Sequence, residues 1–232
     1  NWLHRRLFQR HPSPDELRLA DGFLTDETEV PTPASPLWEY GYGSLDTVSG
    51  EIDFHPLPHF TGNAWQGGPK LPDPELGWVT LHSRGGHVGN DGAHLAIRRW
   101  NAPEAGIVTI RSQLKHLSDK GDGVIAWVRS SRGGIIGTWK VHDRAEEVML
   151  KDVEVGKGEV IDFVVGRNEN QNWDSFEWVP RVTLRPSDSG SSRQHSNAER
   201  DFRGPEEATE PLDAWTAYAQ VLLMSNELVF VD

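Results

Sequence analysis

The chain has 232 residues, a formal net charge of −12 and no cysteine. The negative charge disfavours binding to duplex nucleic acid, which requires clustered Lys and Arg. The absence of cysteine excludes disulfides, thiolate metal sites, thiol catalysis and a covalently attached c-type haem within these residues. No apolar run is long enough to span a bilayer, and the hydrophobic content of 36% suits a chain with an ordinary core.

The first predicted elements are two helices. Residues 2–10 (WLHRRLFQR) place apolar side chains at helical spacing. Ser13 and Glu16 then form a capping box, with Pro14 at the first helical position. Residues 25–36 are acidic and rich in proline, so residues 1–36 are predicted to be a helical hairpin followed by a linker. Because the chain begins inside a helical pattern, we expect it to be a fragment of a longer protein.

From Trp38 the pattern changes to a period of two, which is typical of strands. Eight of the ten tryptophans fall in this region: Trp38, Trp65, Trp78, Trp100, Trp127, Trp139, Trp173 and Trp178. Strands are predicted at residues 37–42, 52–57, 77–82, 94–100, 106–114, 123–130, 134–142, 148–155, 160–165 and 176–184. Many short strands separated by Gly-rich and Asn-rich turns predict a mainly β domain over residues 37–184, a β-sandwich of the jelly-roll or galactose-binding-like type.

The chain is predicted to return to helix at its end. Residues 185–204 are rich in Ser, Arg and Asp, which indicates a flexible linker. Residues 205–232 contain a helix that opens at Pro211 and has one apolar face. Helices this short are marginal alone in water, so we expect this helix to pack on those of residues 2–24, with the β-domain inserted between them. Both linkers should be the first sites of proteolysis.

Two tryptophans are candidates for sugar binding. Trp65 (GNAWQGG) and Trp173 (NQNWDSF) lie among loop-forming residues, where a flat ring can project and stack against a sugar. Trp127, Trp139 and Trp178 lie in strand-like runs and are predicted to be core. Packing is the ordinary role of a tryptophan, so polar neighbours must support the binding interpretation. The predicted ligand-binding residues are Trp65, Trp173, Asn90, Asp91, Asn172 and Asp174.

Oxygen-bearing side chains recur at alternate positions between Asn168 and Asp174. This spacing loosely matches a calcium loop, since Ca²⁺ prefers several oxygen ligands. The predicted metal ligands are Asn168, Asn170 and Asp174. The alternative is a polar turn in which asparagines bond to the local backbone.

A second polar turn covers residues 85–92. Its Asn90 and Asp91 suit a turn, a metal site or a sugar contact, and a structural turn is the simpler interpretation. Arg98 and Arg99 should point to opposite faces of the following strand, one of them buried and paired with Asp91 or Asp174. The scattered histidines have no zinc spacing, and the chain carries no known nucleophile, phosphate or metalloprotease motif. We therefore expect a protein that is not an enzyme.

Several segments resemble a known architecture. The stretches LHRRLFQRHPSPDELRLADGFL and PLDAWTAYAQVLLMSNELVFVD resemble the C-terminal helical region of large planctomycete multidomain proteins that carry a cytochrome-c-type domain. The segments PLPHFTGNAWQGGPKLPDPELGW, GGHVGNDGAHLAIRRW and GKGEVIDFVVGRNENQNWDSFEW are similar to a β-domain inserted near the end of some members. The last of these segments also resembles jelly-roll modules attached to polysaccharide-degrading enzymes. Glu159 departs from the Asp usual there. The resemblance implies an extracytoplasmic location in the periplasm or at the cell surface.

Together these features predict a non-catalytic domain that binds a polysaccharide or oligosaccharide within a larger protein, with Ca²⁺ as a candidate ion. One alternative is a structural module that docks on other domains of the same parent protein, for which an exposed aromatic patch would serve equally. A polysaccharide hydrolase or lyase is the third interpretation, and no residue pair singles it out.

Overall fold

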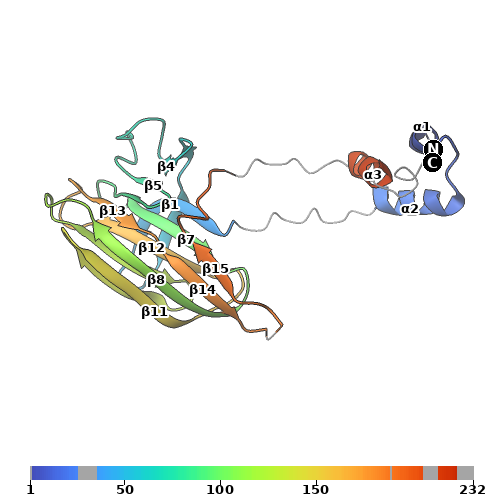
Figure 1. Cartoon of the computed structure of the whole chain (residues 1–232). Coiled ribbons are helices and arrows are strands. Elements are labelled where there is room, and N and C mark those ends of the chain that lie inside the picture. Colours follow the sequence, from blue (N-terminus) through green and yellow to red (C-terminus); the bar gives the residue numbers. More distant parts are fainter. Residues whose placement is uncertain (1, 26–35, 189, 206–213, 224–232) are drawn as a thin grey trace. The chain divides into compact units, whose positions relative to one another are not determined.

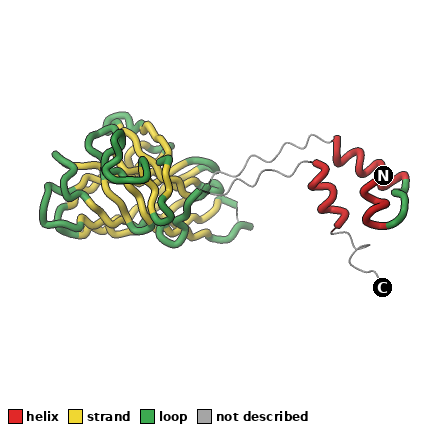
Figure 2. The backbone as a smooth tube through the Cα atoms, turned by 90° about the horizontal axis from the view of Figure 1, so that it is seen from above, coloured by secondary structure: helices red, strands yellow, loops and turns green. Residues whose placement is uncertain are grey.

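The computed structural model describes residues 2–25, 36–188, 190–205 and 214–223. The chain divides into two compact units, one of residues 1–34 with 207–232 and one of residues 35–206 (Figure 1). The first unit is helical where it is described, and the second consists of strands and loops (Figure 2). The predicted linker at residues 25–36 and the predicted helix start at Pro211 lie almost wholly outside the described residues.

The helical unit contains α1 (Trp2–Phe8), α2 (Pro14–Thr25) and α3 (Ala214–Leu223). The predicted capping box is confirmed at the start of α2. The Glu16 backbone N–H donates to Ser13 Oγ at 3.2 Å, and the Ser13 N–H donates to the Glu16 carboxylate at 2.6 Å. α3 packs against α1 and α2, and the buried His4 of α1 bonds through Nε2 to the Tyr218 hydroxyl of α3 at 3.1 Å. Helices from the two ends of the chain therefore lie side by side.

The second unit contains two sheets. The six-stranded sheet has, in spatial order, β10 (Gly134–Val141), β9 (Val124–Ser130), β12 (Val160–Arg167), β7 (Leu95–Asn101), β1 (Trp38–Leu45) and β2 (Ile52–Pro56). The nine-stranded sheet has β15 (Gln194–Asn197), β14 (Arg181–Pro186), β8 (Gly106–His116), β13 (Ser175–Trp178), β6 (Gly85–His87), β5 (Thr80–His82), β4 (Ala64–Gln66) and β3 (His59–Phe60), with β11 (Ala145–Val155) also paired to β8. Figure 1 shows β11, β8 and β14 running beside one another.

Buried side chains from both sheets form one core, which makes the unit a β-sandwich and confirms the mainly β prediction. Phe163 of β12 meets Trp178 of β13 edge-on, with ring centroids 5.4 Å apart. Burial alternates along β8, β9 and β14, as expected for strands with one face on the core. No helix in the described part of the chain, residues 2–25 and 214–223 included, is long and apolar enough to cross a bilayer.

The prediction of a flexible linker at residues 185–204 is wrong in its second half. Residues 194–197 form β15, which pairs with β14 and extends the sandwich beyond residue 184. Ser196 turns inward and accepts a hydrogen bond from the buried Trp100 indole at 3.1 Å, and Ala198 is fully buried. The sequence did not predict this strand because its inward-facing residue is the polar Ser196, which serves as hydrogen-bond acceptor for a core tryptophan, and not an apolar side chain.

Arg98 and Arg99 do point to opposite faces of β7, but the predicted partners are wrong. Arg99 pairs with Asp162 at 2.7 Å, because Asp162 lies directly across from it in the β-ladder. Arg98 is 3% exposed and donates to the backbone carbonyls of Trp178 and His82, each at 2.7 Å. Burial lowers the pKa of Arg98 to about 10. This guanidinium therefore links the two sheets without a carboxylate.

Candidate functional site

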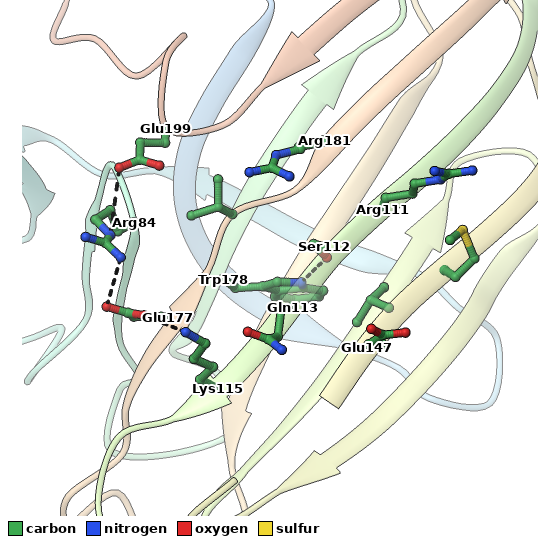
Figure 3. Close-up of a pocket in the computed structure, with 13 residues that line it drawn as sticks. Arg84, Arg111, Ser112, Gln113, Lys115, Glu147, Glu177, Trp178, Arg181 and Glu199 are labelled. Carbon is green, nitrogen blue, oxygen red and sulfur yellow. Dashed lines mark hydrogen bonds and ion pairs between the residues drawn. The ribbon is translucent and has the colours of Figure 1, made fainter. Parts of the chain in front are cut away.

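A groove of about 440 Å³ lies on the face of the nine-stranded sheet that points away from the core (Figure 3). Since alternate residues of a strand share a face, Arg111, Gln113 and Lys115 of β8 stand together on it. Its other charged lining residues come from neighbouring strands and loops: Arg84, Glu147, Glu177, Arg181 and Glu199. The groove is therefore polar, and most of its side chains are set by the regular spacing of a sheet.

Ion pairs and one buried bond fix part of the groove. Glu177 lies 3.6 Å from both Arg84 and Lys115, and Arg84 also lies 3.8 Å from Glu199. Beneath them the Trp178 indole N–H donates to Ser112 Oγ at 2.8 Å, which satisfies the one polar group of a nearly buried ring. Figure 3 shows the ion pairs as dashed lines at one side of the groove and the bond from Trp178 to Ser112 near the middle of the view. The result is a preorganised surface with both donors and acceptors.

Trp173 is exposed, as the sequence predicts. It lies in the loop between β12 and β13, four residues before Glu177, and 57% of its surface is accessible. Lys120 Nζ lies 4.6 Å from the centre of its ring. Its φ angle of 72° is in the left-handed region, which costs a non-glycine residue roughly 1–2 kcal/mol. An exposed ring on a residue with an unfavourable backbone conformation contributes little to folding, which favours a role in binding.

Asp174, beside it, is fully buried, and neither carboxylate oxygen has a hydrogen-bond partner among the described residues. Burial, and then the neighbouring Asp122, raise the pKa of Asp174 to about 7, while Arg167 opposes the shift. Asp122 Oδ1 is also buried without a hydrogen bond. This pair of carboxylates suits either a retained proton or a bound cation.

His116 does not neutralise Asp174, although its Nε2 lies 3.5 Å from Asp174 Oδ1. The Asp143 backbone N–H donates to His116 Nδ1 at 3.3 Å, so the ring proton is on Nε2 and is donated to the Trp173 carbonyl at 3.0 Å. Burial lowers the pKa of His116, which keeps the ring neutral. A neutral ring with both nitrogens engaged is neither a counter-charge nor a free metal ligand.

The predicted ligands Asn168 and Asn170 instead build the loop. Asn168 Nδ2 donates to the Asp122 carbonyl at 3.2 Å, and Asn170 Oδ1 accepts from the Asn172 N–H at 3.0 Å. Within the part of the chain that the structure describes, no group of three or more His, Cys, Asp or Glu is placed to hold a metal. Calcium stays a prediction that depends on Asp174 and on Asp122, a residue that the loop spacing did not indicate.

Trp65 is not the exposed ring that the sequence predicts. It lies in a strand, β4, and is half-buried among other aromatic side chains. Its ring stacks on Tyr40 at 6.2 Å and lies 5.1 Å from Phe60, while its indole N–H donates to the Arg203 carbonyl at 2.9 Å. Trp127 and Trp139 are half-buried too, and Trp178 is buried. Trp65 therefore belongs with the packing tryptophans.

Asn90 and Asp91 lie in the exposed loop between β6 and β7. Asp91 Oδ1 accepts hydrogen bonds from the Ala93 N–H at 2.9 Å and from His94 Nδ1 at 2.7 Å. These are the bonds of a structural turn. The structure does not bring this pair to the groove, whereas it does place Asn172, Trp173 and Asp174 in one loop.

Sequence reasoning missed the groove residues. Their signal was the run of polar side chains at alternate positions of one strand: Thr109, Arg111, Gln113 and Lys115. Which other strands flank that face is a matter of sheet order, which the pattern does not contain.

No family model matches the chain, and no curated protein does. Among solved structures, it is similar to the PA14 sugar-binding domain from an RTX adhesin at 10% identity and a TM-score of 0.29, over 70% of this chain and 94% of that one. It is also similar to the CBM36-1 domain of a multidomain xylanase from the hindgut metagenome of Trinervitermes trinervoides, at 12% identity and a TM-score of 0.30, over 62% and 95%. The secreted serine protease VesC from Vibrio cholerae matches 51% of this chain with 25% of its own, at 14% identity and a TM-score of 0.31. At such distances no site residue is transferable to this chain.

Proposed function

We propose that the β-sandwich binds a carbohydrate without transforming it, through the groove on the nine-stranded sheet and the exposed ring of Trp173. The observation that carries this proposal is the groove itself, a hollow of about 440 Å³ lined by fixed donors and acceptors. Sugar hydroxyls both donate and accept hydrogen bonds, so they suit a surface of amide, carboxylate and guanidinium groups.

The partners for hydroxyl groups stand on rigid strands. Gln113 offers an amide from β8, Glu147 a carboxylate from β11, and Arg181 a guanidinium from β14. Sites on strands hold their geometry better than sites on mobile loops. Trp173 adds the apolar platform for a sugar ring, at the end of the sheet where β13 begins. This arrangement serves recognition of a short stretch of saccharide.

The carboxylates of the groove are poorly suited to glycoside hydrolysis. A general acid must hold its proton near neutral pH, which requires an apolar or electronegative setting. Glu177 instead lies between Arg84 and Lys115, and Glu199 lies near Arg84, a setting that is neither apolar nor electronegative. The proposed role is therefore non-catalytic.

The remaining features of the proposal come from the sequence patterns and the resemblance and, for calcium, from the buried carboxylate oxygens of Asp122 and Asp174 that have no hydrogen-bond partner among the described residues. The sandwich would have jelly-roll topology, be inserted between the helices of a helical domain, and belong to a larger protein at the cell surface or in the periplasm. Calcium would bind at Asp122 and Asp174 and hold the Trp173 loop. None of these features is required for the groove to bind sugar.

A glycan array tests the function directly. The full chain should bind a defined set of glycans, and Gln113→Ala and Trp173→Ala should each reduce that binding tenfold or more. Thr138→Ala is the matched control, because Thr138 is exposed on β10 of the other sheet. Incubation with bound glycans should release no reducing ends. Absence of binding across the array, or equal loss in the Thr138 variant, would refute the proposal.

A second candidate function rests on the helical unit, which exposes large apolar side chains. Trp2 and Leu19 are each 74% exposed. A hollow of about 400 Å³ on the same unit is lined by Trp2, by Leu17 and Leu24 of α2, and by Trp215 and Tyr218 of α3. Exposed apolar area of this kind is typical of docking surfaces. We propose that this unit binds other domains of the parent protein. Leu19→Glu should abolish co-elution with those domains and leave glycan binding unchanged; co-elution of that variant would contradict this role.

A further inference from the structure

Arginines gather on the outer face of the nine-stranded sheet, although the chain carries a net charge of −12. Arg111 of β8 lies directly opposite Arg181 of β14 in the antiparallel ladder. Directly opposed like charges destabilise a strand pair, so this placement is unfavourable for folding alone. Neither guanidinium is paired with a carboxylate of the described chain, and Figure 3 shows no dashed line from either.

A second hollow, of about 370 Å³, continues along the same two strands and shares Arg111 with the groove. It adds Arg185 of β14, and Arg193 and His195 from the segment that forms β15. Asp152 is the one carboxylate among its lining residues. Apart from Arg84, which is ion-paired with Glu177 and Glu199, four arginines line the two hollows: Arg111, Arg181, Arg185 and Arg193. We call these four the arginine ladder.

The carboxylates nearby do not neutralise this ladder. Glu177 and Glu199 lie at the other side of the groove, where they pair with Arg84 and Lys115. The ladder is therefore left to attract an anion from solution. A guanidinium presents a planar fork of donors that binds a carboxylate or sulfate through two parallel hydrogen bonds.

We propose that the groove takes an anionic oligosaccharide, one whose sugars carry carboxylate or sulfate groups. This inference rests on the proposed carbohydrate-binding function and names its ligand class. Arg111 and Arg181 would hold one acidic group. Arg185 lies four residues beyond Arg181 on the same face, about 13 Å along the strand, where it would hold another with Arg193.

The same face disfavours nucleic acid. Glu147 lines the groove and Asp152 lines the second hollow, so carboxylates interrupt the basic surface and would repel a continuous phosphate backbone, whose binding depends on an uninterrupted basic track. An acidic oligosaccharide presents neutral hydroxyls between its charged groups. Those hydroxyls are suitable partners for the interspersed carboxylates.

Titration calorimetry with matched probes tests the inference. Oligogalacturonate and its fully methyl-esterified form share one backbone and differ in charge, and sulfated and unsulfated galactan form a second pair. The full chain should bind the charged member of at least one pair tenfold or more tightly than the neutral member, with affinity falling as salt rises. Arg181→Gln and Arg111→Gln should each weaken that binding tenfold or more. Lys157→Gln, which removes one charge from the exposed turn between β11 and β12, should not.

Melting separates a binding role from a structural one. Removing one of two opposed charges should leave the melting temperature of Arg181→Gln unchanged or raise it. A lower melting temperature would show that the arginine serves the fold. Equal binding of charged and neutral probes would overturn the anionic class and leave the sugar-binding function standing. Equal binding of single-stranded DNA or polyglutamate would show mere attraction of polyanions, and no binding of any glycan would end both proposals.

Discussion

Asp174→Asn should remove a pH-dependent cost to folding. The pKa of Asp174 rises from an ordinary value of 3.8 to about 7 in the folded chain, because the group is buried and close to Asp122. The folded state thus holds a proton that the unfolded state releases. The stability from this proton is fully present below about pH 4 and is lost as pH rises through about 7. The full shift corresponds to at most about 4 kcal/mol at pH 8.

Asparagine has nearly the shape of a protonated aspartic acid and carries no charge at any pH. In chelator-containing buffer the variant should therefore match the unmodified chain below about pH 4, gain on it progressively as pH rises to about 7, and be more stable at about pH 8 by up to about 4 kcal/mol. Urea unfolding at several pH values measures this difference, and comparing the two proteins cancels every other titration. Parallel stability curves for the two proteins would refute the burial of an unpaired carboxyl group.

Three further predictions concern the same domain. Millimolar calcium should raise the melting temperature of the unmodified chain at about pH 8 and leave that of Asp174→Asn unchanged, because a ligand of the folded state alone stabilises it; equal shifts would exclude this site. Trp65→Ala should lower the free energy of unfolding by about 3 kcal/mol, and Trp173→Ala by less than about 1 kcal/mol. Trp173→Gly should melt above Trp173→Ala, because glycine adopts the φ angle of 72° without strain. Comparable losses for the Trp65 and Trp173 variants would show that both rings are core. Arg98→Ala should lower the free energy of unfolding, measured in urea, by about 3 kcal/mol, because it leaves the buried carbonyls of Trp178 and His82 without donors. A loss below about 1 kcal/mol would show that water replaces the guanidinium.

The sequence carried the local determinants of the fold. Alternation of apolar and polar residues predicted strands through β8, β9 and β14, since period two reflects one buried face. The capping box at Ser13 and Glu16 was predictable because it depends on residues three apart. Trp173 was predicted to be exposed from its polar neighbours, and the structure agrees.

The tertiary structure decided what depends on residues distant in sequence. Trp65 has loop-like neighbours, yet packing on Tyr40 and a bond to Arg203 hold it in a cluster that no local pattern contains. β15 pairs with β14, and its Ser196 accepts a hydrogen bond from the Trp100 indole, 96 residues away in the sequence. The groove arises because sheet order places β8 between β11 on one side and β14 and β13 on the other, so that Arg111 meets Arg181 seventy residues later. Local propensity and periodicity depend on neighbouring residues and can therefore be read from the sequence. Strand order, the burial of charge and the shape of a binding face depend on the packing of the whole chain.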